Sequence, residues 1–384
     1  MRVYFDNAAT SRVSENVAKK MTDVMINNYG NPAAMYIMGL EAEKELISAQ
    51  KTLAAIIGCN YDEIYFTSGG SEGDNLSILG TAKGYSRVGK NIITTKIEHP
   101  AVSVPFKNLE AEGFNATYLT VDSKGYINLD ELKNSITNET ILVSIILINN
   151  ETGTIQNIEE IGKIIKDKNP KTIFHVDAVQ AFGKYKINVR KAKVDLLTVS
   201  GHKFHCPKGL GFQYVRNGLK VKPMLFGGEQ QRGLRAGTEN PAGAAALAEG
   251  AKEAYENLEN NEKKVSEIKE YLMNGILNEI PDTFLNGDKI DKASPYVLNI
   301  SFANVRSEVL LHSLEDKGIF VSSGSACNSK NKHLSSVLTA MGVDEKLIGG
   351  AIRFSFSKYN TMDEAIYTLD CLKEIIPMLR RFNR

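Results

Sequence analysis

Short apolar runs alternate with amphipathic helical patterns from residue 14 to about residue 215, and this alternation constrains the fold more than any other feature. Within residues 42–56, for example, apolar side chains recur at spacings of four and three, as along one face of a helix. Several runs are apolar on both faces, which is typical of a mostly parallel sheet covered by helices on both sides. An α/β fold is therefore predicted. Its expected strands are 63–67, 91–97, 116–121, 141–148, 172–178, 194–200 and 211–216.

After residue 215 the chain repeats this mixture on a smaller scale. A glycine-rich segment (227–237) precedes a helical region (about 241–278) that is suited to carry the chain from one domain to the next. Further strands are expected at 297–302, 319–322 and 351–356, and further helices at 306–317 and 361–382. We therefore expect a large domain at 13–256 and a smaller α/β domain made of 1–12 and 257–384.

Composition and charge argue against several classes of protein. The 46 basic and 45 acidic side chains give a formal net charge of +1, which argues against a dedicated nucleic-acid binder. No apolar run approaches the roughly 18 residues of a membrane span, and the first residues do not resemble a signal peptide, so a cytoplasmic protein is expected. The cysteines are far apart and form no CxxC pair, so a special cysteine is expected to be a reagent rather than half of a disulfide. They are Cys59, Cys206, Cys327 and Cys371.

Polar clusters directly follow five of the expected strands. In open α/β sheets, ligands bind beyond the carboxyl ends of the strands. Five polar clusters at five strand ends therefore indicate one shared site. The clusters are 67–72, 98–100, 149–153, 175–180 and 200–203.

Three of these clusters suggest a chemistry, and each has a plainer alternative. Residues 67–71 offer backbone N–H groups and hydroxyls before a helix, which suits a phosphate, although an ordinary strand-to-helix turn has the same pattern. Lys203 lies on a tight turn behind a strand, where it either forms a Schiff base with an aldehyde cofactor or is an ordinary exposed lysine. Asp177 ends an apolar strand, where it either meets a cation such as the protonated ring nitrogen of pyridoxal phosphate or caps a turn.

Single residues outside those clusters carry further signals. Cys327 follows a run of small residues and precedes a basic stretch, so it is either a thiol biased toward thiolate or a surface cysteine on a loop. Arg353 lies in an apolar strand and is expected to pair with an acid, from the protein or from a substrate. The spacing within residues 202–206 matches no familiar zinc pattern, so no metal site is expected. His175 is interpreted as a core histidine.

The order and spacing of these motifs resemble those of the cysteine desulfurases, which are pyridoxal-phosphate enzymes of the class V aminotransferase group. The resemblance covers nearly the whole chain, and it is specific as a combination rather than in any single piece. It departs at Tyr36 and Cys206, where the family usually has histidine and glycine. The segments that carry the resemblance are 4–10, 30–32, 66–69, 98–99, 149–151, 175–180, 200–203, 207–209, 235–238, 322–327 and 353–355.

The resemblance implies a cofactor, pyridoxal 5'-phosphate, and residues that hold it. Lys203 would bind the cofactor and later move the α-proton of the substrate. Asp177 would pair with the ring nitrogen and Gln180 with the ring hydroxyl, while His99 would stack on the ring and assist proton transfer. The phosphate would be held by Gly70, Ser71, Ser200 and His202, joined by Thr238 from a second subunit.

The same resemblance implies the reaction and the partners. Asn150 would contact both cofactor and substrate, and Arg353 would hold the substrate's carboxylate. Cys327 would attack the sulfur of L-cysteine, which leaves a persulfide on the enzyme and releases alanine. The implied fold is that of aspartate aminotransferase, in a cytoplasmic homodimer that passes sulfur to an acceptor protein for iron–sulfur clusters or tRNA thiolation, without direct contact with nucleic acid or membrane. The alternatives are a selenocysteine lyase or another class V pyridoxal enzyme, and a cofactor-bearing scaffold protein with weak catalysis.

Overall fold

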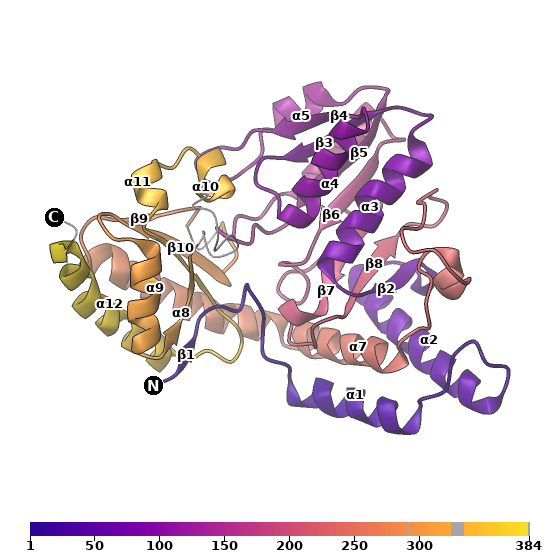
Figure 1. Cartoon of the computed structure of the whole chain (residues 1–384), viewed down its shortest axis with the longest axis horizontal. Helices are drawn as coiled ribbons and strands as arrows, with labels where there is room; N and C mark the ends of the chain where they lie inside the picture. Colours follow the sequence, from indigo (N-terminus) through magenta and orange to yellow (C-terminus); the bar gives the residue numbers. More distant parts are fainter. Residues whose placement is uncertain (290–291, 324–333, 383–384) are drawn as a thin grey trace.

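The larger part of the chain is built on a seven-stranded sheet (Figure 1), in a computed structural model that describes residues 1–289, 292–323 and 334–382. The strands are β2 (Ile64–Thr67), β3 (Asn91–Thr95), β4 (Asn115–Leu119), β5 (Thr140–Ile146), β6 (Ile173–Asp177), β7 (Leu196–Ser200) and β8 (Gly211–Val215). Their order across the sheet is β2-β8-β7-β6-β5-β3-β4. All run parallel except β8, which is antiparallel to both of its neighbours. The predicted mostly parallel sheet is therefore present.

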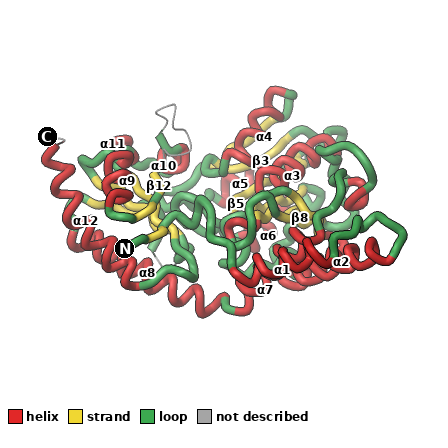
Figure 2. Tube along the Cα trace, turned by 60° about the horizontal axis from the view of Figure 1, so that its bottom comes forward, coloured by secondary structure: helices red, strands yellow, loops and turns green. Residues whose placement is uncertain are grey.

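Helices cover both faces of this sheet. They are α1 (Glu15–Asn27), α2 (Ile37–Ile57), α3 (Gly70–Tyr85), α4 (Pro100–Ala111), α5 (Leu129–Ser135), α6 (Ile158–Lys168) and α7 (Pro241–Glu256), with the short turns η1 (Tyr61–Glu63), η2 (Gly201–Lys203) and η3 (Gln230–Gly233). Ile78 of α3 and Phe106 of α4 belong to one buried apolar cluster, whereas Leu53 of α2 and Ile161 of α6 belong to another. In Figure 2, α1, α2 and α7 lie together along one side of the molecule. The two clusters are the cores on the two faces of the sheet.

The smaller part has a sheet and a core of its own. Its antiparallel sheet has the order β12-β13-β10-β9, and a separate pair of parallel strands joins the two short strands β1 and β11. Helices α8 and α12 pack side by side against it (Figure 2). Its elements are β1 (Val3–Tyr4), α8 (Leu258–Glu279), β9 (Thr283–Leu285), β10 (Val297–Phe302), α9 (Ser307–Asp316), β11 (Ile319–Phe320), β12 (Ser322–Ser323), α10 (Ser336–Ala340), α11 (Glu345–Ile348), β13 (Ala351–Ser355) and α12 (Met362–Phe382). We propose the division into 13–256 and 1–12 plus 257–384 on these pairings.

The seven expected strands of the large sheet are confirmed, with ends that differ by a few residues. Two expectations are wrong in detail. The helical region at 241–278 is two helices, because the chain leaves helical geometry at Asn257, whose side chain favours helix ends. The strand expected at 319–322 is two short strands, since β11 pairs with β1 whereas β12 pairs with β13. Among the described residues, no helix is both long enough and apolar enough to cross a membrane.

Candidate active site

The carboxyl ends of β3, β5, β6 and β7 open onto a cavity of about 490 Å³ where the two parts of the chain meet. Neighbouring parallel strands end at the same edge of a sheet, so the polar clusters that follow them come together there. Among the described residues, every residue predicted for the site lines this cavity except Thr238. The lining residues that the sequence predicts are Gly70, Ser71, His99, Asn150, Asp177, Gln180, Ser200, His202, Lys203 and Arg353.

One wall of the cavity is the turn between β2 and α3, which is built from small residues. Gly69 has a φ of 146°, a conformation that favours glycine, and a Cβ on Gly70 would lie 2.8 Å from Cγ2 of Val179. Ser71 in the first turn of α3 and Ser200 at the end of β7 also line the cavity. Small residues, hydroxyls and the first N–H groups of a helix are the groups that bind a phosphate, so this wall fits the phosphate of pyridoxal phosphate.

Besides Arg353, which bonds Asp6, the N-terminal segment contacts three of the predicted site residues. Lys203 Nζ and Gln180 Nε2 both donate to the carbonyl oxygen of Ala8, at 2.5 and 2.9 Å. Nδ1 of His202 lies 3.2 Å from Oγ1 of Thr10. In the sequence this segment is noticed only because residues 4–10 resemble the cysteine desulfurases. Its contacts could not be predicted, because a backbone carbonyl that accepts a hydrogen bond does not depend on the side-chain pattern.

Two buried carboxylates face the cavity, although the sequence predicts only one of them. Asp177 accepts a hydrogen bond from Val179 N at 2.9 Å, and burial raises its pKa. Asp74 of α3 lies 3.6 Å from Nε2 of His175, and its Oδ1 accepts no hydrogen bond within the described part of the chain. Burial, with the charge of Asp177, raises the pKa of Asp74 well above its usual value. Such a pair is costly unless a cation binds beside it, so this wall fits a protonated ring nitrogen.

The histidines in and behind the cavity are neutral at neutral pH. His99 begins α4 and accepts a hydrogen bond from Ala101 N at 3.1 Å, while burial and then the Lys203 charge lower its pKa to about 4. His175 is the core histidine that the sequence predicts. Its two ring nitrogens lie 2.8 Å from Ser144 Oγ and 2.9 Å from Thr198 Oγ1, and burial lowers its pKa to about 3.

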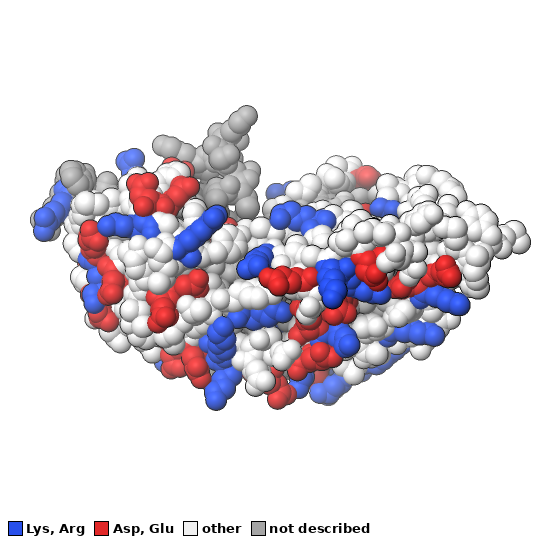
Figure 3. Space-filling view, turned by 90° about the horizontal axis from the view of Figure 1, so that it is seen from below, with Lys and Arg blue, Asp and Glu red and all other residues white. Residues whose placement is uncertain are grey.

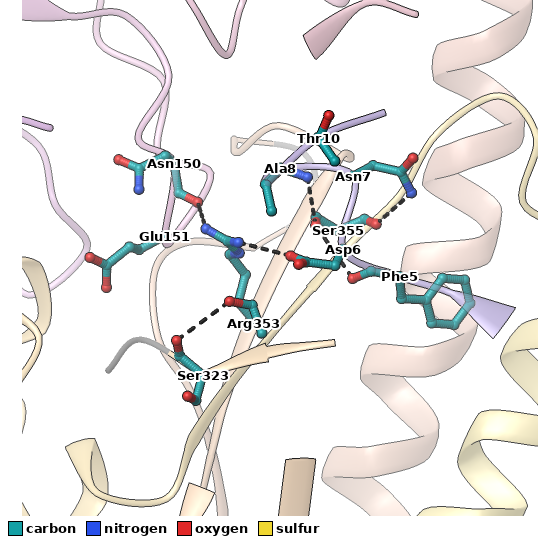
Figure 4. A network of polar contacts seen from close by, with 12 residues as sticks. Phe5, Asp6, Asn7, Ala8, Thr10, Asn150, Glu151, Ser323, Arg353 and Ser355 are labelled. Carbon is teal, nitrogen blue, oxygen red and sulfur yellow. Dashed lines mark hydrogen bonds and ion pairs between the residues drawn. The ribbon is translucent and has the colours of Figure 1, made fainter. Parts of the chain in front are cut away.

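Arg353 of β13 reaches the cavity from the small part, where two segments hold its guanidinium (Figure 4). Nη1 donates to the carbonyl oxygen of Asn150 at 3.0 Å, and Nη2 donates to Oδ1 of Asp6 at 2.9 Å. Arg353 Nε and Asn150 Oδ1 are both buried and have no hydrogen-bond partner among the residues described. The sequence leaves open whether the acid partner of Arg353 is a protein group or a substrate. Asp6 is one such partner, and no sequence signal singles it out.

One predicted site residue of the described chain, Thr238, does not line the cavity. Thr238 lines a separate pocket of about 110 Å³ with Arg235 and Gln231, and Cys327 lies outside the described residues. Cys206 is fully buried, its Sγ lies 3.4 Å from the carbonyl oxygen of Ala246, and burial raises its pKa. Within residues 1–289, 292–323 and 334–382, no group of three or more His, Cys, Asp and Glu side chains is placed to hold a metal ion.

Comparisons with known proteins agree with this geometry. The sequence pattern of the family "Aminotransferase class-V" matches residues 3–367. A protein of Nostoc sp. named cysteine desulfurase is 43% identical over 381 residues, which cover 99% of this chain and 94% of that protein. The solved structure of a NifS-like protein has a TM-score of 0.93 and 39% identity, and covers 98% of this chain and 100% of its own. A structure of SspA in complex with cysteine has a TM-score of 0.82 and 31% identity over 94% of this chain and 100% of its own.

These likenesses extend over almost the whole chain, and they confirm the predicted α/β fold of the pyridoxal-phosphate transferases. The cavity adds an independent argument, because it presents an amine, buried carboxylates and a wall of small residues at one sheet edge. Those are the groups that pyridoxal phosphate requires. The chain belongs to the class V aminotransferase family and, within it, to the cysteine desulfurases, which depend on pyridoxal phosphate.

Proposed function

We propose that this protein takes the sulfur of L-cysteine, forms a persulfide on Cys327 and releases L-alanine. One observation carries the proposal: Lys203, Asp177 and Arg353 all line a single cavity. The Lys203 amine and the Asp177 carboxylate suit the cofactor to which the amine of an amino acid would be attached. The Arg353 guanidinium suits the carboxylate of the same amino acid.

The chain's own residues would hold pyridoxal phosphate in that cavity. Lys203 would bind it covalently, and Asp177 would keep a proton at the ring nitrogen. When bound, the cofactor withdraws electrons from an attached amino acid. The phosphate would be held by Gly70, Ser71, Ser200 and His202.

The remaining groups would hold the substrate and move its protons. Arg353 and the Asn150 side-chain amide N–H would hold the carboxylate of L-cysteine, which fits the buried Arg353 Nε donor that has no partner in the described part of the chain. The Lys203 amine would take the α-proton and return a proton to carbon. His99, with a pKa lowered to about 4, is a neutral imidazole at neutral pH; because its Nδ1 accepts from Ala101 N, its Nε2–H would be a hydrogen-bond donor that assists proton transfer.

Sulfur transfer needs a nucleophile, and the resemblance to the cysteine desulfurases implies Cys327 for this role. Its thiolate would attack the substrate sulfur, so that an S–S bond forms while the C–S bond breaks and the carbon takes a proton to give alanine. Thiolate is the strongest nucleophile among side chains near neutral pH. Ser322 lines the cavity, and Ser322 and Ser323 form β12, which pairs with the strand of Arg353 and precedes Cys327 in the sequence.

We further propose a homodimer in which Thr238 of one subunit completes the phosphate site of the other. Thr238 does not line the cavity of its own chain, which supports a role across an interface. The corner between α1 and α2 also exposes many large apolar side chains, and a patch of this kind marks an interface. They are Met25, Ile26, Tyr29, Met35, Tyr36, Ile37 and Leu40. Active monomer in equilibrium sedimentation would contradict this proposal.

The sulfur acceptor would be a protein of the cytoplasm that serves iron–sulfur clusters or tRNA thiolation. The attacking cysteine must be a reduced thiol before each turnover, and that compartment keeps thiols reduced. On the face shown in Figure 3, basic and acidic side chains are mixed, and the described part of this face has no broad area of one sign. Such a face suits a protein partner better than the phosphates of a nucleic acid.

The deciding experiment is to incubate the purified enzyme, loaded with pyridoxal phosphate, with L-cysteine and a reducing thiol. Alanine and sulfide should appear in equal amounts. A second arm with L-selenocysteine measures selenide, and a much faster turnover there would indicate a selenocysteine lyase instead. A protein that binds the cofactor but yields neither product would be a scaffold rather than an enzyme.

A further inference from the structure

Asp6 places a carboxylate in the cavity, in contact with the guanidinium that would hold the substrate. We infer that Asp6 is a positioning residue, which orients Arg353 for the carboxylate of the amino-acid substrate. This inference rests on the proposed function and deepens it, because it names the group that sets how tightly the substrate's carboxylate binds.

The two contacts of Arg353 fix the plane of its guanidinium. They involve different nitrogens and come from different segments, Asn150 after β5 and Asp6 after β1. A planar guanidinium that is held at two nitrogens cannot rotate about its terminal bonds. The side chain is only 12% exposed, and its Nε has no hydrogen-bond partner among the described residues. Nη1 and Nη2 are thus held in place (Figure 4), while the buried Nε stays available to a ligand.

Asp6 can serve as a support because its own backbone is braced. Phe5 O accepts a hydrogen bond from Ser355 N at 2.7 Å, and Asn7 N donates to Ser355 O at 3.2 Å. These bonds tie the segment to β13, the strand that carries Arg353. The carbonyl oxygen of Asp6 also accepts from Ala9 N at 3.0 Å, which closes a turn. The carboxylate and the guanidinium therefore stand on the same rigid unit, as a preorganised site requires.

The opposite role for Asp6 would be that of a competitor. A carboxylate bound to Arg353 can occupy the place of the substrate, and its removal would then tighten binding. The geometry favours support over competition, because Asp6 takes only Nη2 and leaves the buried Nε without a partner in the described chain. The pKa of Asp6 is raised by burial, and the Arg353 charge lowers it in turn. The two roles predict changes of opposite sign, so one binding measurement decides between them.

The test measures binding of L-alanine and of cysteamine to the cofactor-loaded enzyme by absorbance titration. Alanine carries the carboxylate, whereas cysteamine is cysteine without it. We expect Asp6→Ala to raise the dissociation constant of alanine about tenfold, as for a lost charge-assisted hydrogen bond, and that of cysteamine less than about twofold. Asp6→Asn keeps an acceptor for Nη2 and should raise the alanine constant by only about threefold. With cysteine as substrate, Asp6→Ala should raise KM more than it lowers kcat.

Two controls separate positioning from general damage. Tyr4→Phe removes a hydrogen bond of Tyr4 Oη to Thr10 O in the same segment without touching Arg353, and it should leave alanine binding unchanged. In an Arg353→Ala background, Asp6→Ala should have no further effect on alanine binding, because the group that it positions is gone. Circular dichroism and cofactor content confirm that each variant is folded.

The inference is overturned if Asp6→Ala leaves alanine binding unchanged, tightens it, or weakens alanine and cysteamine equally. It is also overturned if the effect persists in the Arg353→Ala background. These outcomes concern Asp6 alone, because the wild-type enzyme would still release alanine and sulfide from cysteine. If the wild type releases neither, the proposed function fails first.

Discussion

The large sheet presents its site residues at the ends of adjacent parallel strands, whereas the small part reaches the cavity with Arg353 from an antiparallel strand and Asp6 from the N-terminal segment. The first set follows local sequence patterns, one strand after another. The second set brings together residues 347 positions apart. The large part supplies the groups suited to the cofactor and also Asn150, whereas the small part supplies Arg353, the cation suited to the substrate's carboxylate.

Because of this difference, substitutions in the two parts should affect different steps. Asp177 and Lys203 lie on neighbouring elements of one braced sheet, so the cofactor side depends on a single core. Arg353 instead depends on contacts with Asp6 and Asn150, which belong to separate segments. A variant of the large part should therefore change cofactor binding, while a variant of the small part should change substrate binding or sulfur transfer and leave the cofactor in place.

Lys203→Ala should have the largest effect, because it removes both the predicted covalent link and the base. We expect activity to fall by about a thousandfold or more. In the wild type, borohydride should fix the cofactor to a single peptide that contains Lys203, and mass spectrometry checks this. Lys208→Ala is the matched control, since this lysine is exposed in the same connection between β7 and β8, and the variant should keep the bound cofactor. Labelling of a different peptide would refute the assignment.

Cys327→Ser should sharpen the contrast between the two parts. The variant should bind the cofactor normally and still show the absorbance change on adding cysteine, because the groups of the large sheet are intact. Persulfide and sulfide release should fall by about a hundredfold or more, since a hydroxyl is a far weaker nucleophile than a thiolate. Sulfide assays and mass spectrometry of the persulfide measure this. Loss of the cofactor in this variant would show that the two roles are not separable.

Glu98→Gln tests the buried carboxyl group that follows β3 of the large sheet. Burial raises the pKa of Glu98 to about 8, so the folded protein keeps a proton that the unfolded chain releases near its usual pKa. The unfolded state thus binds fewer protons between these two values, and stability falls as pH rises toward 8. The variant keeps the acceptor for Thr95 Oγ1 and Ile146 N, and it should remove about 1–2 kcal/mol of this loss between pH 6 and 8. The measurement is thermal unfolding of both proteins at several pH values. If the stability of the variant changes with pH as that of the wild type does, Glu98 does not contribute to this loss.

Cys206→Ser should have the smallest effect on activity, less than about twofold. Cys206 is buried against α7, and its Sγ contacts the carbonyl oxygen of Ala246 rather than the cavity. A serine hydroxyl can donate to the same oxygen, so stability should drop by only about 1 kcal/mol. Sulfide release and thermal unfolding measure the two quantities. If Cys206 proves essential while Cys327 does not, the sulfur path runs through the large part and the division of roles fails.

The sequence by itself determined the elements of the large sheet and the polar residues at their ends. Strand and helix patterns follow from the local alternation of apolar side chains, and parallel strands must end at a common edge, so Asp177, His99 and Lys203 could be expected in one place. Chemistry-bearing side chains such as these stand out in a linear sequence because each follows its own apolar run.

Only the tertiary structure decided which distant segments complete the cavity. The Asp6–Arg353 bond joins the two ends of the chain. The Lys203 ammonium donates to the Ala8 carbonyl across the two parts, and Asp74 faces the cavity because α3 packs on the large sheet. Asp6 lies in a short strand-like segment that is not distinguished by charge or periodicity, and a backbone carbonyl is common to every residue. Local patterns determine which elements form, but the packing of the whole chain determines which of their polar atoms meet.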